Sequence, residues 1–355
     1  MARHFHRIRV RKINKETSEC VSIEFDIPED KKDLFQFKQG QNITIKSDID
    51  GGRRAYSICS SPLENRLAVA VKHIPNGVFS TFALEKLREG DELEIMEPAG
   101  SFFTELAVDQ SKYYVFFAAG SGITPIISII KTVLATEKDS RVALFYGNKS
   151  VSTIIFKDEL EALKDRYMER CSLTYILSRE QTDSPLNTGR IDNEKLQQLD
   201  PLFDFSKGDE FFVCGPEAMI FTVRDYLKEK GVAASKIHFE LFNTPVAEEK
   251  KQEEKPETKA TSQESAVSIT VDGRTYDVDV PYDRPTILDA GLDMGIDLPY
   301  SCKSGVCTTC RAKLLKGEVE MDCNYGLEDY EVEQGYILTC QSHPRTPECE
   351  VDYDQ

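Results

Sequence analysis

The sequence predicts a multidomain fold in which an antiparallel β-barrel, a Rossmann-like α/β domain and a small cysteine-rich β domain follow one another. Three observations predict it. Short strands separated by turn residues fill residues 1–108, apolar strands alternate with helices over 109–245, and four cysteines with a distinctive spacing stand within 266–355. Between the last two domains, residues 246–265 carry six Glu and four Lys and no aromatic residue. This composition predicts a flexible charged linker.

The composition of the whole chain narrows the class of protein. The chain has 355 residues, and 44 Lys and Arg against 61 Asp and Glu give a net charge of -17. So acidic a protein is a poor partner for nucleic acid or for an anionic membrane surface. The basic start of the chain, residues 1–7, has no apolar run behind it, and glycines and a proline interrupt the longest apolar stretch, Val115 to Ile130. Ten cysteines without an export signal predict a cytoplasmic protein.

The barrel is predicted from six short strands. They lie at Phe5–Val10, Val21–Ile27, Asn42–Ile45, Ala55–Ile58, Leu67–His73 and Glu92–Met96. In the stretch that begins just before the fourth strand, Arg54 and Tyr56 share one face and Ser57 takes the other. An arginine fork suits a pyrophosphate, and a tyrosine offers a plane for stacking. Taken alone, the same pattern is found in many ordinary strands.

A second feature of the barrel segment points to phosphate. A helix is predicted at Phe79–Leu87, and the stretch Gly77-Val78-Phe79-Ser80-Thr81 opens it. A glycine and hydroxyl groups at the start of a helix suit phosphate binding, because the free backbone N–H groups point outward there. The alternative is that Ser80 and Thr81 only cap the helix.

The second domain is predicted from alternating strands and helices. Strands are expected at Tyr113–Ala119, Val142–Tyr146, Cys171–Leu177, Glu210–Cys214 and Ile237–Leu241, with helices at Ile126–Leu134, Phe156–Asp165 and Glu217–Lys228. This order indicates a parallel sheet. The first strand-to-helix turn, Gly120-Ser121-Gly122-Ile123-Thr124-Pro125, matches the dinucleotide fingerprint except that Pro125 replaces the third glycine. Proline is accepted at the start of a helix.

Two further stretches of this domain are candidates for binding residues. Ser178-Arg179-Glu180 follows a predicted strand, and Cys214-Gly215-Pro216 follows a later one. An arginine suits the 2′-phosphate of NADPH, whereas a glutamate suits the free ribose hydroxyl of NADH. NADPH is favoured and NADH stays open. Without other signals, the Cys-Gly-Pro stretch is only a strand-to-helix connection.

The third domain contains the most specific motif of the chain. Cys302, Cys307 and Cys310 form a C-x4-C-x2-C array, and Cys340 follows after 29 intervening residues. This is the spacing of plant-type [2Fe–2S] ligands. The small residues between the cysteines allow backbone N–H groups to reach the cluster sulfurs. A four-cysteine zinc site normally uses two C-x2-C pairs, and a disulfide is less expected still in a chain without an export signal.

Together, these motifs resemble the ferredoxin–NADP reductase superfamily extended by a C-terminal plant-type [2Fe–2S] ferredoxin domain of the β-grasp fold. The resemblance implies an FAD, held at its pyrophosphate by Arg54 and Ser80 with Gly77 and Thr81. It implies that Tyr56 stacks on the flavin, that Ser57 lies near its N5 atom, and that Val71 and Lys72 line it with backbone.

The same resemblance assigns the nicotinamide side and the cluster. It implies that Gly120, Gly122, Thr124 and Pro125 bind the NAD(P) pyrophosphate, that Ser178 and Arg179 hold a 2′-phosphate, and that Cys214, Gly215, Pro216, Met219 and Phe242 line the nicotinamide. The expected catalytic residues are Ser57, Cys214 and Glu240, and the expected cluster ligands are Cys302, Cys307, Cys310 and Cys340. Hydride then passes from nicotinamide C4 to flavin N5, and single electrons pass to the cluster.

Within this superfamily, several stretches are similar to the reductase components of phenylacetyl-CoA epoxidase (phenylacetate-CoA oxygenase) systems. They are residues 54–59, 118–125, 242–245, 298–303 and 324–327. The resemblance implies that electrons reach a partner di-iron oxygenase. The third domain has 18 acidic and 7 basic residues, and such a surface could steer a basic partner. Three alternatives remain: a reductase of another hydroxylase or desaturase, a diaphorase-type flavin reductase, and a non-redox scaffold with a structural metal.

Overall fold

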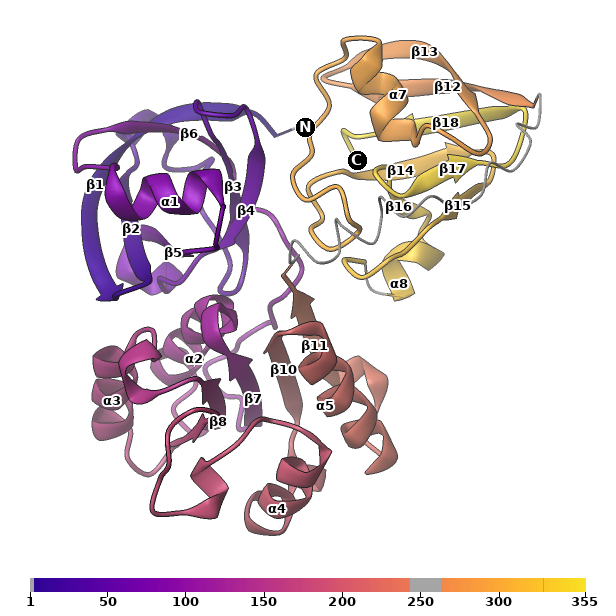
Figure 1. The fold of residues 1–355 in the computed structure, drawn as a ribbon. Coiled ribbons are helices and arrows are strands. Elements are labelled where there is room, and N and C mark those ends of the chain that lie inside the picture. Colours follow the sequence, from indigo (N-terminus) through magenta and orange to yellow (C-terminus); the bar gives the residue numbers. More distant parts are fainter. Residues whose placement is uncertain (1–2, 243–262, 328) are drawn as a thin grey trace.

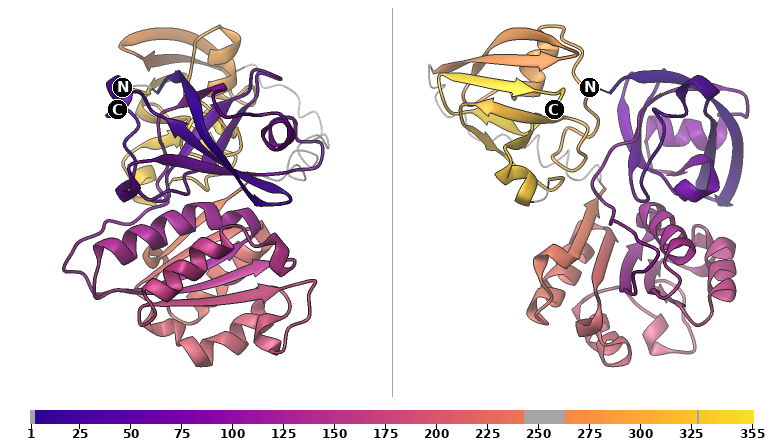
Figure 2. Two further views of the ribbon diagram at one scale, coloured as in Figure 1. Left: turned by 90° about the vertical axis from the view of Figure 1, so that its left-hand side faces the viewer. Right: turned by 180° about the vertical axis from the view of Figure 1, so that it is seen from behind.

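The computed structural model describes residues 3–242, 263–327 and 329–355. They form three domains, and the first and third lie side by side above the second (Figures 1 and 2). The predicted fold class is confirmed. Of the predicted linker 246–265, residues 246–262 lie outside the described residues, and the first strand of the third domain already begins at Glu264.

The first domain is an antiparallel barrel. Its strands are β1 (Phe5–Thr17), β2 (Cys20–Asp26), β3 (Asn42–Lys46), β4 (Arg53–Ser57), β5 (Leu67–Lys72) and β6 (Glu92–Met96). They are ordered β4-β3-β6-β1-β2-β5, and an antiparallel bridge between Ile58 and Val69 joins the two ends. Helix α1 (Val78–Glu85) packs against β5 and β2 through the buried Phe79 and Ala83. Alternating apolar side chains such as Ile23 of β2 fill the interior.

The second domain is a five-stranded parallel sheet with helices on both faces. Its strands are β7 (Tyr113–Ala119), β8 (Arg141–Asn148), β9 (Cys171–Leu177), β10 (Glu210–Gly215) and β11 (Ile237–Leu241). Its helices are α2 (Ile123–Thr136), α3 (Lys157–Arg166), α4 (Asn193–Phe203) and α5 (Glu217–Glu229). The near-continuous apolar strands are buried on both sides, with α2 and α3 on one face and α4 and α5 on the other.

The strand order β11-β10-β7-β8-β9 contains a reversal between β7 and β10. The chain winds outward in one direction from β7 through β8 to β9, and in the other direction from β10 to β11. At such a switch point the two strand-to-helix turns diverge and leave a crevice at the carboxyl ends of the strands. The turns after β7 and β10 are those singled out in the sequence, around Gly120 and Gly215.

The third domain is a mixed sheet with one main helix. Its elements are β12 (Glu264–Val271), β13 (Arg274–Pro281), α7 (Ile287–Asp293), β14 (Arg311–Lys316), β15 (Val319–Met321), α8 (Asp329–Glu333), β16 (Tyr336–Leu338), β17 (Ser342–Pro344) and β18 (Glu348–Asp352). The main sheet is ordered β13-β12-β18-β14-β16, and β12 pairs in parallel with β18. Strands β12 and β13 form an antiparallel hairpin that turns at Asp272-Gly273. Among the described helices of the whole chain, none has the length and apolar character needed to cross a membrane.

Candidate cofactor sites

The strand predicted to hold FAD lies at an edge of the barrel, and its arginine is held in place. The guanidinium of Arg54 makes two hydrogen bonds to the Asp50 carboxylate, at 3.2 and 2.6 Å, and a third to the Gly52 carbonyl at 3.2 Å. The Arg54 hydrogen bond lowers the pKa of Asp50 to about 2. The side chain of Arg54 is 33% exposed, so its fork is oriented by Asp50 while part of it still faces solvent.

The remaining predicted flavin residues lie around the same end of the barrel. The ring of Tyr56 packs on Phe79 of α1, with centroids 5.6 Å apart. The hydroxyl of Ser80 accepts a hydrogen bond from the Ile74 backbone N–H at 3.1 Å and donates to the Gly77 carbonyl at 3.2 Å. Gly77 is the N-cap of α1 with no side-chain cap, and the Thr81 N–H bonds back to its carbonyl. Ser80 therefore orders the turn before the helix and does not cap it.

The two residues of β5 that were predicted to line the flavin, Val71 and Lys72, direct their side chains to different places. Val71, whose backbone was predicted to line the flavin, has its side chain buried in the barrel core. The side chain of Lys72, next along β5, leaves the barrel and lines the cleft of the second domain, with its Nζ 3.4 Å from where a Cβ on Gly120 would lie. The sequence indicated a backbone role for Lys72, and the structure adds a cation at the dinucleotide turn.

The dinucleotide turn fits tightly at the switch point. Gly120 has φ +54°, a left-handed conformation that glycine adopts without strain, and its carbonyl accepts a hydrogen bond from Tyr146 at 2.9 Å. A Cβ on Gly122 would lie 2.1 Å from the carbonyl oxygen of Cys214. A side chain at this position would push the two turns apart. Pro125 is the third residue of α2, in the first turn, where its missing N–H has no intrahelical partner to lose.

A cleft of about 660 Å³ opens above this switch point. Its lining includes several predicted residues: Gly120, Ser178, Gly215, Pro216, Met219 and Phe242. It also includes Lys149 and Arg190, which sequence reasoning missed because both stand in loops that only the fold brings together. The cleft has the size and position expected for a dinucleotide site in an open α/β sheet.

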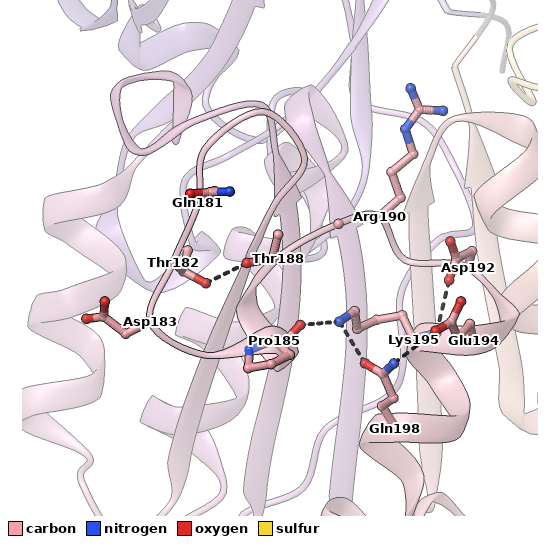
Figure 3. Close-up of a pocket in the computed structure, with 11 residues that line it drawn as sticks. Gln181, Thr182, Asp183, Pro185, Thr188, Arg190, Asp192, Glu194, Lys195 and Gln198 are labelled. Atoms are coloured by element: carbon pink, nitrogen blue, oxygen red, sulfur yellow. Dashed lines mark hydrogen bonds between the residues drawn. The ribbon is translucent and has the colours of Figure 1, made fainter.

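The end of the cleft predicted to read the 2′-position is more complex than the sequence suggested. Ser178 lines the cleft, whereas the exposed Arg179 lines neither it nor the neighbouring pocket of about 620 Å³. Figure 3 shows that second pocket, where Arg190 points away from a buried lysine, Lys195. The Nζ of Lys195 donates to the Pro185 carbonyl at 2.7 Å and to the Gln198 side chain at 2.9 Å.

The three residues predicted to be catalytic come from two domains and meet at the domain boundary. Ser57, at the end of β4, donates through Oγ to Oε2 of Glu240 at 3.0 Å. Glu240 lies on β11, directly opposite Cys214 in the parallel pairing of β10 and β11. Burial raises the pKa of Glu240 to about 7, and it also raises the pKa of the Cys214 thiol. Near neutral pH this carboxyl group can therefore hold or release a proton.

Sequence reasoning missed a fourth member of this group, Asn42. Asn42 begins β3, faces Ser57 across the β3–β4 pairing, and is only 3% exposed. Its side chain also hydrogen-bonds Glu240, and this bond, like that of Ser57, lowers the pKa that burial raises. Its Oδ1 has no hydrogen-bond partner. The side chain of Asn42 is therefore a buried carboxamide with an unused acceptor beside Ser57 and Glu240. The position in a short strand gave no sign of it.

The four predicted cluster ligands lie close together, in two pairs. The Cys302 thiol accepts hydrogen bonds from the backbone N–H groups of Ser304 and Cys307, at 3.5 and 3.3 Å, and Cys307 Sγ accepts from Cys302 N–H at 3.4 Å. The hydrogen bond to Cys307 lowers the pKa of Cys302 to about 5. Cys310 and Cys340 form the second hydrogen-bonded pair. Backbone N–H groups of the loop thus donate hydrogen bonds to the sulfur atoms of Cys302 and Cys307.

The arrangement of the thiols in two pairs is the one that a two-iron cluster uses. Among the described residues, no group of three or more His, Cys, Asp or Glu side chains converges as one metal ion requires. Two thiol pairs suit two irons with two thiolates each. In addition, the buried hydroxyl of Ser301 lacks a hydrogen-bond partner, and the Thr309 side chain hydrogen-bonds Cys307, so polar groups stand beside the thiols. All ten cysteines lie within the described residues and are free thiols.

Comparison with known families matches all three domains. The family described as oxidoreductase FAD-binding domain matches residues 7–103, the oxidoreductase NAD-binding domain matches 116–225, and the 2Fe-2S iron-sulfur cluster binding domain matches 269–345. The three matches follow the order of the three domains in the fold. FAD, a pyridine nucleotide and a [2Fe–2S] cluster are thus the cofactors of this architecture.

Similar proteins match over nearly the whole chain. One of the subunits of 1,2-phenylacetyl-CoA epoxidase from Escherichia coli (strain K12) is 42% identical over 353 residues, covering 99% of this chain and 98% of that protein. The ferredoxin reductase component of 3-ketosteroid-9-alpha-monooxygenase from Rhodococcus rhodochrous is 32% identical over 98% of this chain and 96% of its own. The solved structure of phthalate dioxygenase reductase superposes with a TM-score of 0.59, 25% identity and 98% coverage of both chains.

Proposed function

We propose roles for the individual residues of this chain, its electron donor and its electron acceptor, starting from its family. The chain belongs to the reductase components of multicomponent oxygenases, which join FAD-binding, NAD-binding and 2Fe-2S domains. It is an oxidoreductase that takes reducing equivalents from a pyridine nucleotide and passes electrons on to an oxygenase component. The observation that carries the proposal for its individual residues is the meeting of Ser57 from the barrel with Glu240 from the parallel sheet.

The proposed roles follow from where the side chains lie. Gly120 leaves room for the pyrophosphate of the nucleotide, Gly122 lets the turn pack closely against Cys214, and Lys72 adds a positive charge at Gly120. Ser57 and Asn42 orient the Glu240 carboxyl group, which holds or releases a proton at the domain boundary. When bound, FAD and the cluster supply the change from two-electron to one-electron chemistry.

The proposed cluster ligands are Cys302, Cys307, Cys310 and Cys340. Their backbone donors, the unpartnered hydroxyl of Ser301 and the hydrogen bond from Thr309 to Cys307 support this assignment. The test is the visible spectrum of the purified protein before and after anaerobic addition of NADPH. Flavin bands with a broad red shoulder that both bleach are expected. Flavin bands alone would favour the diaphorase-type alternative, and a colourless protein that binds zinc would overturn the proposal.

We further propose that the electron donor is NADPH. Lys149 and Arg190 line the cleft together with Ser178, and Arg179 follows at the end of β9. Positive charge suits a 2′-phosphate. Replacing Arg190, which lines the cleft, by alanine is expected to raise the KM for NADPH at least tenfold while the KM for NADH changes less than twofold. Equal effects on the two nucleotides would contradict the assignment.

The proposed electron acceptor is a phenylacetyl-CoA epoxidase, and the reaction takes place in the cytoplasm. The 42% identity along the full chain to a component of that enzyme supports this acceptor over that of the more distant 3-ketosteroid monooxygenase. Ten free thiols suit a reducing compartment. The test combines this protein with the purified oxygenase components of the Escherichia coli enzyme and measures NADPH-dependent epoxidation of phenylacetyl-CoA. Product formation with a different hydroxylase but not with this one would contradict the proposal.

A further inference from the structure

Arg53, at the start of β4, belongs to the barrel but directs its side chain to the third domain. Its Nη1 donates to the Leu298 carbonyl at 3.2 Å, and its Nη2 lies 3.4 Å from the Asp297 carboxylate. The next residue, Arg54, turns to the opposite side, toward Asp50, as alternation along a strand requires. Two neighbouring arginines thus serve two different sites.

The guanidinium of Arg53 lies over two aromatic rings, one from each domain. Its Cζ lies 4.0 Å from the ring centroid of Tyr300 in the third domain and 4.9 Å from that of Phe5 in the barrel. The Arg53 side chain is only 12% exposed, whereas that of Asp297 is 88% exposed. An exposed carboxylate contributes little, so the stack and the carbonyl bond make most of the contact.

This contact lies next to the cysteine loop. Tyr300 stands two residues before the proposed ligand Cys302. The Ser101 hydroxyl of the barrel donates at 3.2 Å to the carbonyl of Gly326, whose backbone lies against Val306 of the loop. Val306, within the loop, packs against the core of the second domain. The loop is thus in contact with both other domains, and Arg53 is a largely buried charged side chain that holds it.

Other contacts between the third domain and the barrel are weaker. The His4–Asp272 pair measures 3.2 Å, but both side chains are about half exposed, at 54% and 44%. Interfaces of this kind between domains of one chain normally permit relative motion. If a domain is docked for only part of the time, its observed rate of electron transfer is reduced in proportion to the docked fraction. A buried, stacked anchor next to the loop raises the docked fraction.

We propose that Arg53 is a positioning residue that docks the cysteine loop beside the flavin end of the barrel, in the arrangement through which electrons pass from flavin to cluster. The proposal rests on the proposed function, because it assumes FAD between β4 and the cleft and a cluster on the four cysteines. Arg53 touches neither reacting group in this assignment. Arg53 affects electron transfer only through the distance between flavin and cluster and through the fraction of time for which the third domain is docked.

The test uses the full-length protein with FAD and cluster bound, mixed anaerobically with NADPH in a stopped-flow instrument. In Arg53→Ala, flavin bleaching is expected to keep its rate within twofold, while cluster bleaching slows at least tenfold. Arg53→Lys keeps the charge but loses the planar fork, and an intermediate rate is expected. FAD and iron contents are measured in each sample, so that lost cofactor is not mistaken for slow transfer.

Lys46→Ala is the matched control. Lys46 is the strand partner of Arg53, its Nζ lies 5.6 Å from the same Phe5 ring, and its ion pair is with Glu94 of the barrel. Removing it deletes a neighbouring charge whose partners both lie within the first domain. Both bleaching rates are therefore expected to stay unchanged. Tyr300→Leu, which removes the other half of the stack, is expected to repeat the effect of Arg53→Ala and provides a second variant if that protein fails to fold.

The outcomes separate this inference from the proposed function. Unchanged cluster bleaching in both Arg53→Ala and Tyr300→Leu would overturn the positioning role. Slower flavin bleaching or loss of FAD in Arg53→Ala would overturn it as well, because Arg53 would then belong to the flavin site. If NADPH bleached neither flavin nor cluster in the wild-type protein, the proposed function would fail, whatever the variants showed.

Discussion

The barrel forms two interfaces that differ in kind. With the second domain it shares a single hydrophobic core, in which Cys59, Ala68 and Ala70 of the barrel pack with the isoleucines of α2. Buried hydroxyls add polar bonds there: Ser128 donates to the Ser60 carbonyl at 2.6 Å, and Ser61 and Thr132 lie 2.8 Å apart. These two domains are therefore joined as closely as the layers of one domain.

The interface with the third domain has no comparable core among the described residues. The apolar cluster of that domain consists entirely of its own residues, from Val267 to Tyr353. Its contacts with the barrel include those of Arg53, Ser101 and His4. The comparison teaches that the proposed hydride-transfer site, which spans the first interface, is held rigidly, while the cluster domain is held by a few separable contacts. The predictions below test this difference, starting with the largest effect.

Cys307→Ser is expected to abolish electron transfer through the third domain while flavin reduction in the first two domains continues. It removes one thiolate from the proposed cluster, so electron delivery to an oxygenase should fall more than a hundredfold. Flavin reduction by NADPH should remain within twofold, because the barrel and second domain share a core that does not include the third domain. Iron content, the visible spectrum and stopped-flow bleaching measure this. A matching loss of flavin reduction would show that the third domain supports the hydride site.

Glu240→Gln is expected to remove a pH dependence of stability. The pKa of Glu240 is raised from 4.5 to about 7, mainly by burial. The stability due to the protonated carboxyl group is present below pH 4.5 and is lost as the pH rises through 7. The loss reaches up to about 3 kcal/mol. Urea unfolding at pH 5 and pH 8 should show a larger decrease in wild type than in the variant. Parallel decreases would contradict the raised pKa.

Ser128→Val tests the rigid interface. The substitution leaves the buried Ser60 carbonyl without its hydrogen bond, which costs about 1–3 kcal/mol in the free energy of unfolding. Far-UV circular dichroism during urea unfolding measures it. Thr132→Ser keeps the neighbouring hydroxyl bond to Ser61 and is the matched control. A cost below about 0.5 kcal/mol would mean that water replaces the bond, and that this interface is more open than the core packing indicates.

Ser101→Ala tests the separable interface and should have the smallest effect. Ser101 is partly exposed, and its bond to Gly326 joins domains that each have their own core. The expected change in unfolding free energy is below about 0.5 kcal/mol, the usual range for surface substitutions. The same urea titration as for Ser128→Val measures it. A change as large as that of Ser128→Val would erase the difference between the two interfaces.

Local patterns were sufficient for much of the fold and part of the site. Alternating and continuous apolar runs predicted most strands of the first two domains, because burial on one or two faces leaves a direct trace in the sequence. Helix α4 was not predicted, since Pro201 interrupts its pattern, and neither were β15 and β17, which have only three residues each. Such short strands exist because a partner strand is present, and their own residues carry little signal.

Contacts between distant segments account for what was missed at the site. Asn42 joins Glu240 only because β3 and β11 meet at the domain boundary, and Lys72 enters the cleft only because β5 ends beside Gly120. Lys149 and Arg190 stand in separate loops and both line the cleft. In each case the residue type is ordinary and the chemistry comes from its neighbours.

The sequence by itself determined the features that depend on chain-local geometry. The cysteine spacing, the glycines at the nucleotide turn and the order of the three domains belong to this class, because each concerns residues within one loop or one repeating pattern. Tertiary structure alone decided which side chains meet across domains, including the pairing of Ser57 with Glu240 and the stacking of Arg53 on Tyr300. The physical reason is that such contacts depend on how whole domains pack, which no short stretch of sequence encodes.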